Sequence, residues 1–191
     1  MNETLSPEEK QTLLQLARES LECAVNGTKP PALDKVHLTP ALQAEGASFV
    51  TLTVHGGLRG CIGALEPYQS LAEDVREHAV AAALNDYRFP PMTAGELGEI
   101  EIEVSRLTIP VPLEYTDAGD LLAKLRPGVD GVILKDGPSR RATFLPQVWE
   151  KIPDPAEFLD NLCYKMGSPP DTWRRKKLDV LVYQVEEFHE E

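Results

Sequence analysis

The sequence has few cysteines and no long hydrophobic run. Its three cysteines, Cys23, Cys61 and Cys163, are odd in number and form no Cys-x-x-Cys pair, which supports neither a disulfide framework nor a zinc knuckle. Free thiols are typical of a reducing compartment, so we expect a cytoplasmic protein. No apolar stretch approaches the ~20 residues that a membrane span needs, and the polar start of the chain predicts no signal peptide.

Basic residues are also scarce. The chain has 19 Lys and Arg against 31 Asp and Glu, a net charge of −12. A surface this acidic repels phosphate groups, which disfavours general binding to nucleic acids and to anionic membranes. The basic run at residues 174–177 is a local exception that could bind an anion, although a solvated face before a strand is the simpler interpretation.

Motifs for metals and cofactors are missing as well. The sequence contains no His-Glu-x-x-His, no phosphate-binding P-loop, no Gly-x-Gly-x-x-Gly and no cysteine triplet for an iron–sulfur cluster. The four histidines, His37, His55, His78 and His189, are scattered without triad-like or metal-ligand spacing. We therefore predict no metal and no cofactor.

What the sequence does contain predicts a mixture of helices and hairpins. Ser6, Ser70 and Asp154 each precede a glutamate by three positions, which is the signature of a helix start. Apolar periodicity predicts helices at about 7–25, 71–84, 117–125 and 155–166, and strands at 47–54, 58–65, 99–107, 131–135, 140–145 and 178–185. This order lacks strict strand–helix–strand alternation, so we predict one α+β domain over residues 1–191, with antiparallel or mixed sheets packed by helices.

Three finer expectations follow from the same patterns. His55-Gly56-Gly57 predicts a three-residue turn between the first two strands. In the strand at 99–107, Ile100, Ile102 and Val104 should face inward, while Glu101, Glu103 and Ser105 face outward. Residues 186–191 are expected to form an acidic tail after the last strand.

Residues 58–63, Leu-Arg-Gly-Cys-Ile-Gly, are the first candidate for chemistry. Alternation places Arg59, Cys61 and Gly63 on one face of the strand. Arg59 beside Cys61 would favour the thiolate, which is the nucleophilic form. The glycines, Gly60 and Gly63, mark a bulge or a close approach by a ligand or another backbone. Two alternatives stay open: Cys61 is a small buried hydrophobe, or Arg59 forms a salt bridge with Glu101 or Glu103.

Residues 85–91, Asn-Asp-Tyr-Arg-Phe-Pro-Pro, are the second candidate. Asp86 and Arg88 lie at the end of an alanine-rich helix, next to a rigid Pro-Pro corner. They could shape a ligand site, or they could cap the helix and pair with each other.

Together these segments resemble the AMMECR domain family over nearly the whole chain. Residues 58–63 carry its hallmark unaltered, and residues 82–91, 103–107, 145–149 and 158–165 match its other blocks. At residues 166–168 the chain has Met-Gly-Ser where the family more often has Ala-Gly-Leu, which is a change in packing.

The resemblance implies a larger and a smaller lobe, with the Arg59-Gly60-Cys61 strand near the cleft between them, and an activity that is not established. It also implies a component of an AmmeMemoRadiSam-type system. The expected partners are a Memo-type protein, related to extradiol dioxygenases, and a radical-SAM protein. Cys61 and Arg59 are then catalytic candidates, and Gly60, Gly63, Asp86 and Arg88 are ligand-binding candidates. A non-catalytic scaffold for the two partners is the alternative. An RNA-associated regulator is disfavoured by the charge of −12, and the sequence leaves a homo-oligomer open.

Overall fold

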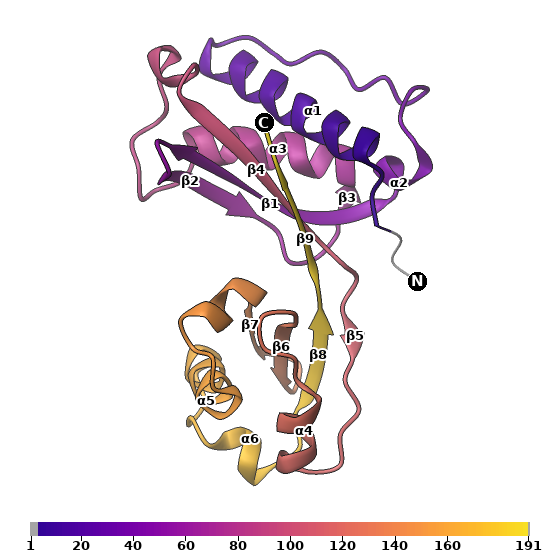
Figure 1. Ribbon diagram of the computed structural model, residues 1–191, viewed down its shortest axis with the longest axis vertical. Helices are drawn as coiled ribbons and strands as arrows, with labels where there is room; N and C mark the ends of the chain where they lie inside the picture. The colour runs from indigo at the N-terminus through magenta and orange to yellow at the C-terminus, as the bar shows by residue number, and fades with distance from the viewer. Residues whose placement is uncertain (1–3, 191) are drawn as a thin grey trace. The chain divides into compact units, whose positions relative to one another are not determined.

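The computed structural model describes residues 4–190, which divide into two compact units. The first and larger unit takes the chain up to Leu107 together with the segment from Glu186 onward, and the second is Thr108–Val185. Each unit combines one antiparallel sheet with helices (Figure 1). The predicted α+β class is therefore confirmed, whereas the single domain over residues 1–191 stays a prediction.

In the first unit, helices cover one face of a five-stranded sheet. The strands β1 (Glu45–Val54), β2 (Gly57–Gly63), β4 (Ile100–Leu107) and β9 (Val185–His189) follow the order β2-β1-β4-β9, and β3 (Gln69–Ser70) pairs with β1. The helices are α1 (Pro7–Val25), the short α2 (Pro40–Gln43), α3 (Leu71–Leu84) and the 3-10 turn η1 (Ala94–Glu96). The core joins one face of the sheet to α1 and α3 through buried residues that include Leu13, Leu21, Val50, Leu52, Val75, Ala79 and Ile102.

The two main helices of this unit begin where the sequence predicts. The backbone N–H of Glu9 donates to Ser6 Oγ at 3.2 Å, and the N–H of Ser6 donates to Glu9 Oε2 at 2.8 Å, so both halves of a capping box are present. Ser70 Oγ likewise accepts the N–H of Glu73 at the start of α3.

The hairpin between β1 and β2 differs from the prediction in two ways. Its loop has two residues, His55 and Gly56, both with positive φ (51° and 76°), as the twist of a tight hairpin requires. Leu52 pairs with Gly60 but Thr53 pairs with Leu58, so Arg59 is the extra residue of a β-bulge. The predicted alternation is therefore wrong at Leu58, which lies on the same face as Cys61.

The expected acidic tail is instead a strand. Residues Val185–His189 form β9 at the edge of the first sheet, next to β4. Phe188 is buried in the core, and Glu186 forms ion pairs with Lys10 and Arg106. The acidic composition of this segment suggested a solvated tail. The buried side chain of Phe188 and the basic partners of Glu186 instead stabilise its pairing with β4. Ser105, expected to face outward, is also buried.

The second unit has a four-stranded sheet in the order β5-β8-β6-β7. Its strands are β5 (Val111–Pro112), β6 (Gly131–Asp136), β7 (Arg140–Phe144) and β8 (Asp179–Tyr183), and its helices are α4 (Ala118–Lys124), η2 (Pro146–Glu150), α5 (Pro155–Lys165) and α6 (Thr172–Arg175). The core is built around Phe158, whose ring stacks on Trp149 with centroids 3.6 Å apart.

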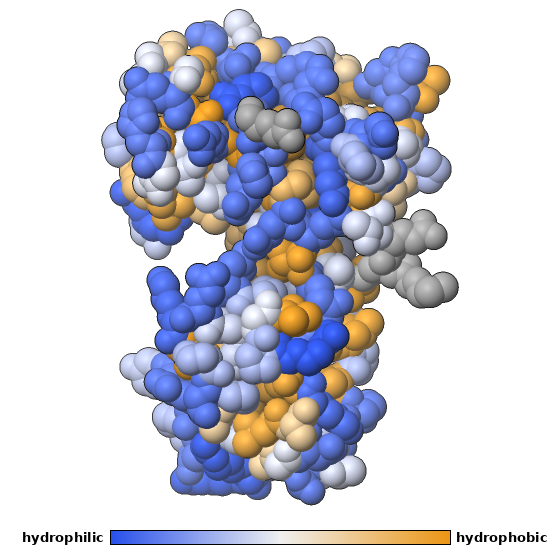
Figure 2. Space-filling model, in the orientation of Figure 1, coloured by the Kyte–Doolittle hydropathy of each residue, from blue (hydrophilic) through white to orange (hydrophobic). Residues whose placement is uncertain are grey.

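Hydrophilic side chains cover much of the visible face of each unit (Figure 2). Within residues 4–190, no helix has both the length and the apolar character needed to cross a membrane.

Candidate functional site

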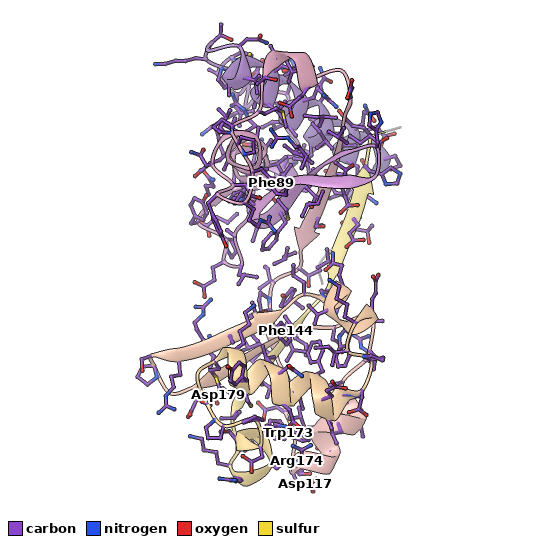
Figure 3. All side chains as sticks on the ribbon, turned by 90° about the vertical axis from the view of Figure 1, so that its left-hand side faces the viewer. Phe89, Asp117, Phe144, Trp173, Arg174 and Asp179 are labelled. Atoms are coloured by element: carbon purple, nitrogen blue, oxygen red, sulfur yellow. The ribbon has the colours of Figure 1, made fainter. Side chains whose placement is uncertain are left out.

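The two segments singled out in the sequence meet at the edge of β2. Helix α3 ends at Leu84, and the chain then turns, with the N–H of Phe89 donating to the carbonyl of Asp86 at 3.0 Å. This turn brings Asp86 and Arg88 to the backbone of Cys61. Phe89, the residue after Arg88, is labelled in Figure 3.

The backbone of Cys61 is held on both sides by side chains. Its N–H donates to Asp86 Oδ2 at 2.9 Å, and its carbonyl accepts Arg88 Nη2 at 3.2 Å. Because β2 is an edge strand, these polar groups have no further strand to bond, and an open edge invites pairing with another chain. Asp86 and Arg88 thus close the edge of the sheet at Cys61.

Asp86 and Arg88 form a close ion pair of their own. Arg88 Nε and Nη2 donate to the two carboxylate oxygens of Asp86 at 2.9 and 2.6 Å, in the forked geometry that arginine favours. The side chain of Asp86 is 2% exposed, and that of Arg88 is 43% exposed. The Arg88 guanidinium, with help from the N–H of Cys61, holds the pKa of Asp86 well below its usual range.

Arg59, the bulged residue, turns to a different carboxylate. Its Nε donates to Glu96 Oε1 at 2.7 Å, and its Nη2 donates to the carbonyl of Pro90 at 3.0 Å. The salt bridge that the sequence left open is therefore formed, but with Glu96 rather than with Glu101 or Glu103. Arg59 lowers the pKa of Glu96 to about 2. The guanidinium carbons of Arg59 and Arg88 lie 5.9 and 5.6 Å from the ring centroid of Phe89.

The thiol of Cys61 is half-buried on the face of the sheet opposite to α3. Thr51, its direct cross-strand neighbour, donates its hydroxyl to Cys61 Sγ at 3.4 Å. Of the other cysteines, Cys163 is fully buried and Cys23 is half-buried on α1. The alternative interpretation, a small buried hydrophobic residue, therefore describes Cys163 better than Cys61.

The charges around Cys61 are balanced locally. The predicted cation, Arg59, is directed to Glu96, whereas Arg88 is the guanidinium that bonds the backbone carbonyl of Cys61. Each of these arginines has a carboxylate partner, Glu96 or Asp86. The region thus orients a thiol without presenting a net positive charge.

The two glycines of the hallmark are required by packing. A Cβ on Gly60 would lie 2.1 Å from the carbonyl oxygen of Ala82 in α3, and one on Gly63 would lie 2.4 Å from the carbonyl oxygen of Ser48. Of the two close approaches that the sequence predicted, by a ligand or by another backbone, the second accounts for both positions. Their roles as ligand-binding residues stay predictions.

Sequence reasoning did not identify three residues that make contacts in this region: Thr51, Phe89 and Glu96. Phe89 was quoted only as part of a motif. Glu96 is 37 positions away from Arg59. Its one local signal is Thr93, three positions earlier, whose backbone N–H and hydroxyl donate to the Glu96 carboxylate at the start of η1.

Metal ligands and a histidine base are not gathered at this site. His37, His55 and His78 lie beside Asp34, Glu99 and Asp74, and His189 is on β9, which β1 and β4 separate from β2. In the part of the chain that the structure describes, no group of three or more His, Cys, Asp or Glu side chains could hold a metal ion.

The basic run at residues 174–177 is largely paired within the second unit. Ion pairs join three of its members to carboxylates: Arg174 to Asp160, Arg175 to Asp171 and Lys176 to Asp136. Lys177 lies over the ring of Tyr115. These contacts support the simpler interpretation of this run, as a solvated and internally paired face.

Comparisons with known proteins found similar chains over nearly the whole length. The AMMECR1 family model matches residues 14–188. A protein of Methanothermobacter thermautotrophicus is 40% identical over 192 residues, which cover 98% of this chain and 97% of that protein. The protein MK0488 of Methanopyrus kandleri is 37% identical over 199 residues, covering 100% and 93% of the two chains. The crystal structure of the uncharacterised protein PH0010 from Pyrococcus horikoshii is similar with a TM-score of 0.83 and 33% identity, covering 98% of this chain and 94% of that one.

Proposed function

Because the chain belongs to the AMMECR1 family, we propose that it is a cytoplasmic component of an AmmeMemoRadiSam-type system that acts through its Arg59-Gly60-Cys61 strand. In this proposal Cys61 is the group that contacts or attacks a ligand. Asp86 and Arg88 position it through its backbone, and Arg59 fixes the adjacent bulge. The partners would be a Memo-type protein and a radical-SAM protein.

One observation carries this proposal: a half-buried thiol sits on a peptide whose N–H and carbonyl are both bonded by side chains. A functional group is most effective when the surrounding contacts hold it in one geometry. The contacts that close the edge of the sheet therefore also hold the peptide that carries the Cys61 thiol in one geometry. The thiolate is the reactive form of cysteine, so electrophilic carbon or sulfur centres are the class of ligand that this site suits.

A non-catalytic scaffold for the same two partners is the second candidate. The specific observation in its favour is that Thr51 is the hydrogen-bonding neighbour of Cys61 Sγ and that His37, His55 and His78 are paired elsewhere. A nucleophilic cysteine usually has a general base within hydrogen-bond reach. The scaffold would bind its partners without using the Cys61 thiol.

The two candidates are separated by co-elution experiments on the full chain with a Memo-type and a radical-SAM protein from the same genome. We expect a complex to form and to slow the labelling of Cys61 by iodoacetamide. The Cys61→Ser variant should still form the complex, but it should lack the iodoacetamide label whose attachment the partners slow. Cys23→Ser, the matched variant at the other half-buried cysteine, should change neither result.

Failure of all three proteins to co-elute would contradict membership of the system. Co-elution in which Cys61 labels equally fast with and without the partners would favour the scaffold.

A further inference from the structure

A concave site lies in the first unit, between α1 and α3. The groove has a volume of about 420 Å³, within the range of small-molecule sites. It shares no residue with the Cys61 site. Figure 1 shows α1 and α3 packed as neighbours in this unit, and the loop after α1 contributes Pro30 to the groove.

The groove is lined by one face of each helix. On α3 each lining residue has another one three or four positions away, as on a single helical face, and on α1 Ser20 and Ala24 do the same. The apolar part of the lining is made by Ala24, Pro30, Val80 and Ala81. Such a surface suits a short hydrocarbon side chain.

Arg76 is the buried charged residue among those that line this groove. It is 8% exposed, which is rare for arginine. Its Nε donates to Ser20 Oγ at 3.0 Å and its Nη2 donates to the carbonyl of Pro31 at 2.7 Å, and both of these acceptors are neutral.

The charge of Arg76 is only loosely compensated. Within residues 4–190 its one ion pair is with Glu73, at 3.5 Å from Nη1, and the Glu73 side chain is 43% exposed. Charge-assisted hydrogen bonds are normally ~2.7–2.9 Å long. A buried charge is unfavourable unless it is well paired, so a carboxylate entering the groove would improve the surroundings of Arg76.

The rim of the groove carries the opposite charge. Glu73 and Glu77 both line it, and Glu77 also accepts Gln69 Nε2 at 2.7 Å. Two carboxylates near one guanidinium would repel a dianion such as phosphate and would attract an ammonium group. The groove therefore offers three surfaces together: a buried cation, an acidic rim and an apolar wall.

We propose that this groove binds a small zwitterion with an apolar side chain, the chemistry of a free aliphatic α-amino acid. The carboxylate of the ligand bonds Arg76 Nη1 and displaces the long contact to Glu73. The ammonium group then lies between Glu73 and Glu77, and the side chain packs against Ala24, Val80 and Ala81. This site goes beyond the proposed function, because it uses neither Cys61 nor a partner protein.

The test is a titration of the 15N-labelled full chain with L-leucine, followed by amide chemical shifts. Two close analogues each remove one charge: leucinamide lacks the carboxylate and N-acetyl-leucine lacks the ammonium. We expect saturable shifts on α1 and α3 with leucine, and binding at least ~tenfold weaker for each analogue, because each loses a charged hydrogen bond.

Variants make the test independent of folding. Arg76→Gln should abolish binding, but Arg76 also anchors Ser20 and Pro31, so this variant alone is not decisive. Ala81→Phe fills the groove without touching these anchors and should abolish the leucine shifts, whereas Ala81→Ser should keep them. The proposal is overturned if leucine gives no saturable shifts, if both analogues bind as well as leucine, or if Ala81→Phe binds normally.

Discussion

The edge of β2 and the α1–α3 groove use arginine in opposite ways. At the edge, Arg88 and Arg59 lie 2.6 and 2.7 Å from Asp86 and Glu96. In the groove, Arg76 is more deeply buried, yet its carboxylate partner is 3.5 Å away. At the edge, the paired charges of Arg88 and Asp86 hold the backbone that carries a thiol. In the groove, the charge of Arg76 is left available to a ligand.

The largest effect is expected where β2 meets α3. Gly60→Ala should lower the free energy of unfolding by about 3 kcal/mol, because the new methyl group would overlap the backbone of Ala82. Gly98→Ala is the matched control, since nothing lies within 4 Å of its Cβ position, and it should be close to neutral. Urea unfolding measures both variants. Equal stabilities would mean that the edge is not packed tightly on the helix.

The next effect concerns Asp86 and Arg88, the two side chains that bond the backbone of Cys61. Asp86→Ala leaves the N–H of Cys61 without its buried acceptor and Arg88 without its carboxylate, which should cost about 2 kcal/mol of stability. Asp86→Asn keeps an acceptor and should cost less. A loss below about 0.5 kcal/mol for Asp86→Ala, the level of an ordinary surface change, would remove the distinction between the edge and the groove.

A smaller effect is expected at Glu96, and it depends on pH. The folded-state pKa of about 2 lies below the ordinary value of 4.5, so the ionised carboxylate stabilises the fold above pH 4.5 and loses this effect as the pH falls towards 2. Since Glu96 is one-third exposed, Glu96→Gln should cost about 1 kcal/mol or less at pH 7. Urea unfolding at pH 7, 4 and 2.5 should show the variant and the parent converging. A difference that stays constant with pH would argue against the ion pair with Arg59.

The smallest effect is expected at Glu73. Its contact with Arg76 is long and its side chain is nearly half-exposed, so Glu73→Ala should change stability by less than about 0.5 kcal/mol. The same urea measurements apply. A loss as large as that of Asp86→Ala would show that Arg76 is firmly paired, and the groove would then resemble the edge.

Much of the fold was predictable because its signals are local. Caps at Ser6 and Ser70 and the alternation of Ile100, Ile102 and Val104 mark elements within a few residues. The strand β9 was not predictable in this way, because it pairs with β4, which lies far away along the chain. A bulge was one expectation for Gly60 and Gly63, but its position at Arg59 follows from the shifted register between Thr53 and Leu58, which no residue pattern marks.

The candidate site was predictable in composition but not in its pairing. Cys61, Asp86 and Arg88 were all singled out, and the structure brings them together. The sequence could not assign Arg59 to Glu96 or Arg88 to the carbonyl of Cys61, because side-chain partners separated by 27 or 37 positions leave no periodic signal. The close contact of Gly60 with Ala82 is equally invisible, although the glycine itself marks a special position.

The central claim is that the edge of β2, closed by Asp86 and Arg88, presents Cys61 as an accessible thiol. The most direct test of this claim is the rate at which Cys61 is alkylated in the native chain. Iodoacetamide labelling at pH 7.5, resolved peptide by peptide in a mass spectrometer, compares all three cysteines within one sample. The account predicts that Cys61 reacts at least ~100-fold faster than the fully buried Cys163, whose labelling requires unfolding. A Cys61 that reacts as slowly as Cys163 would contradict it.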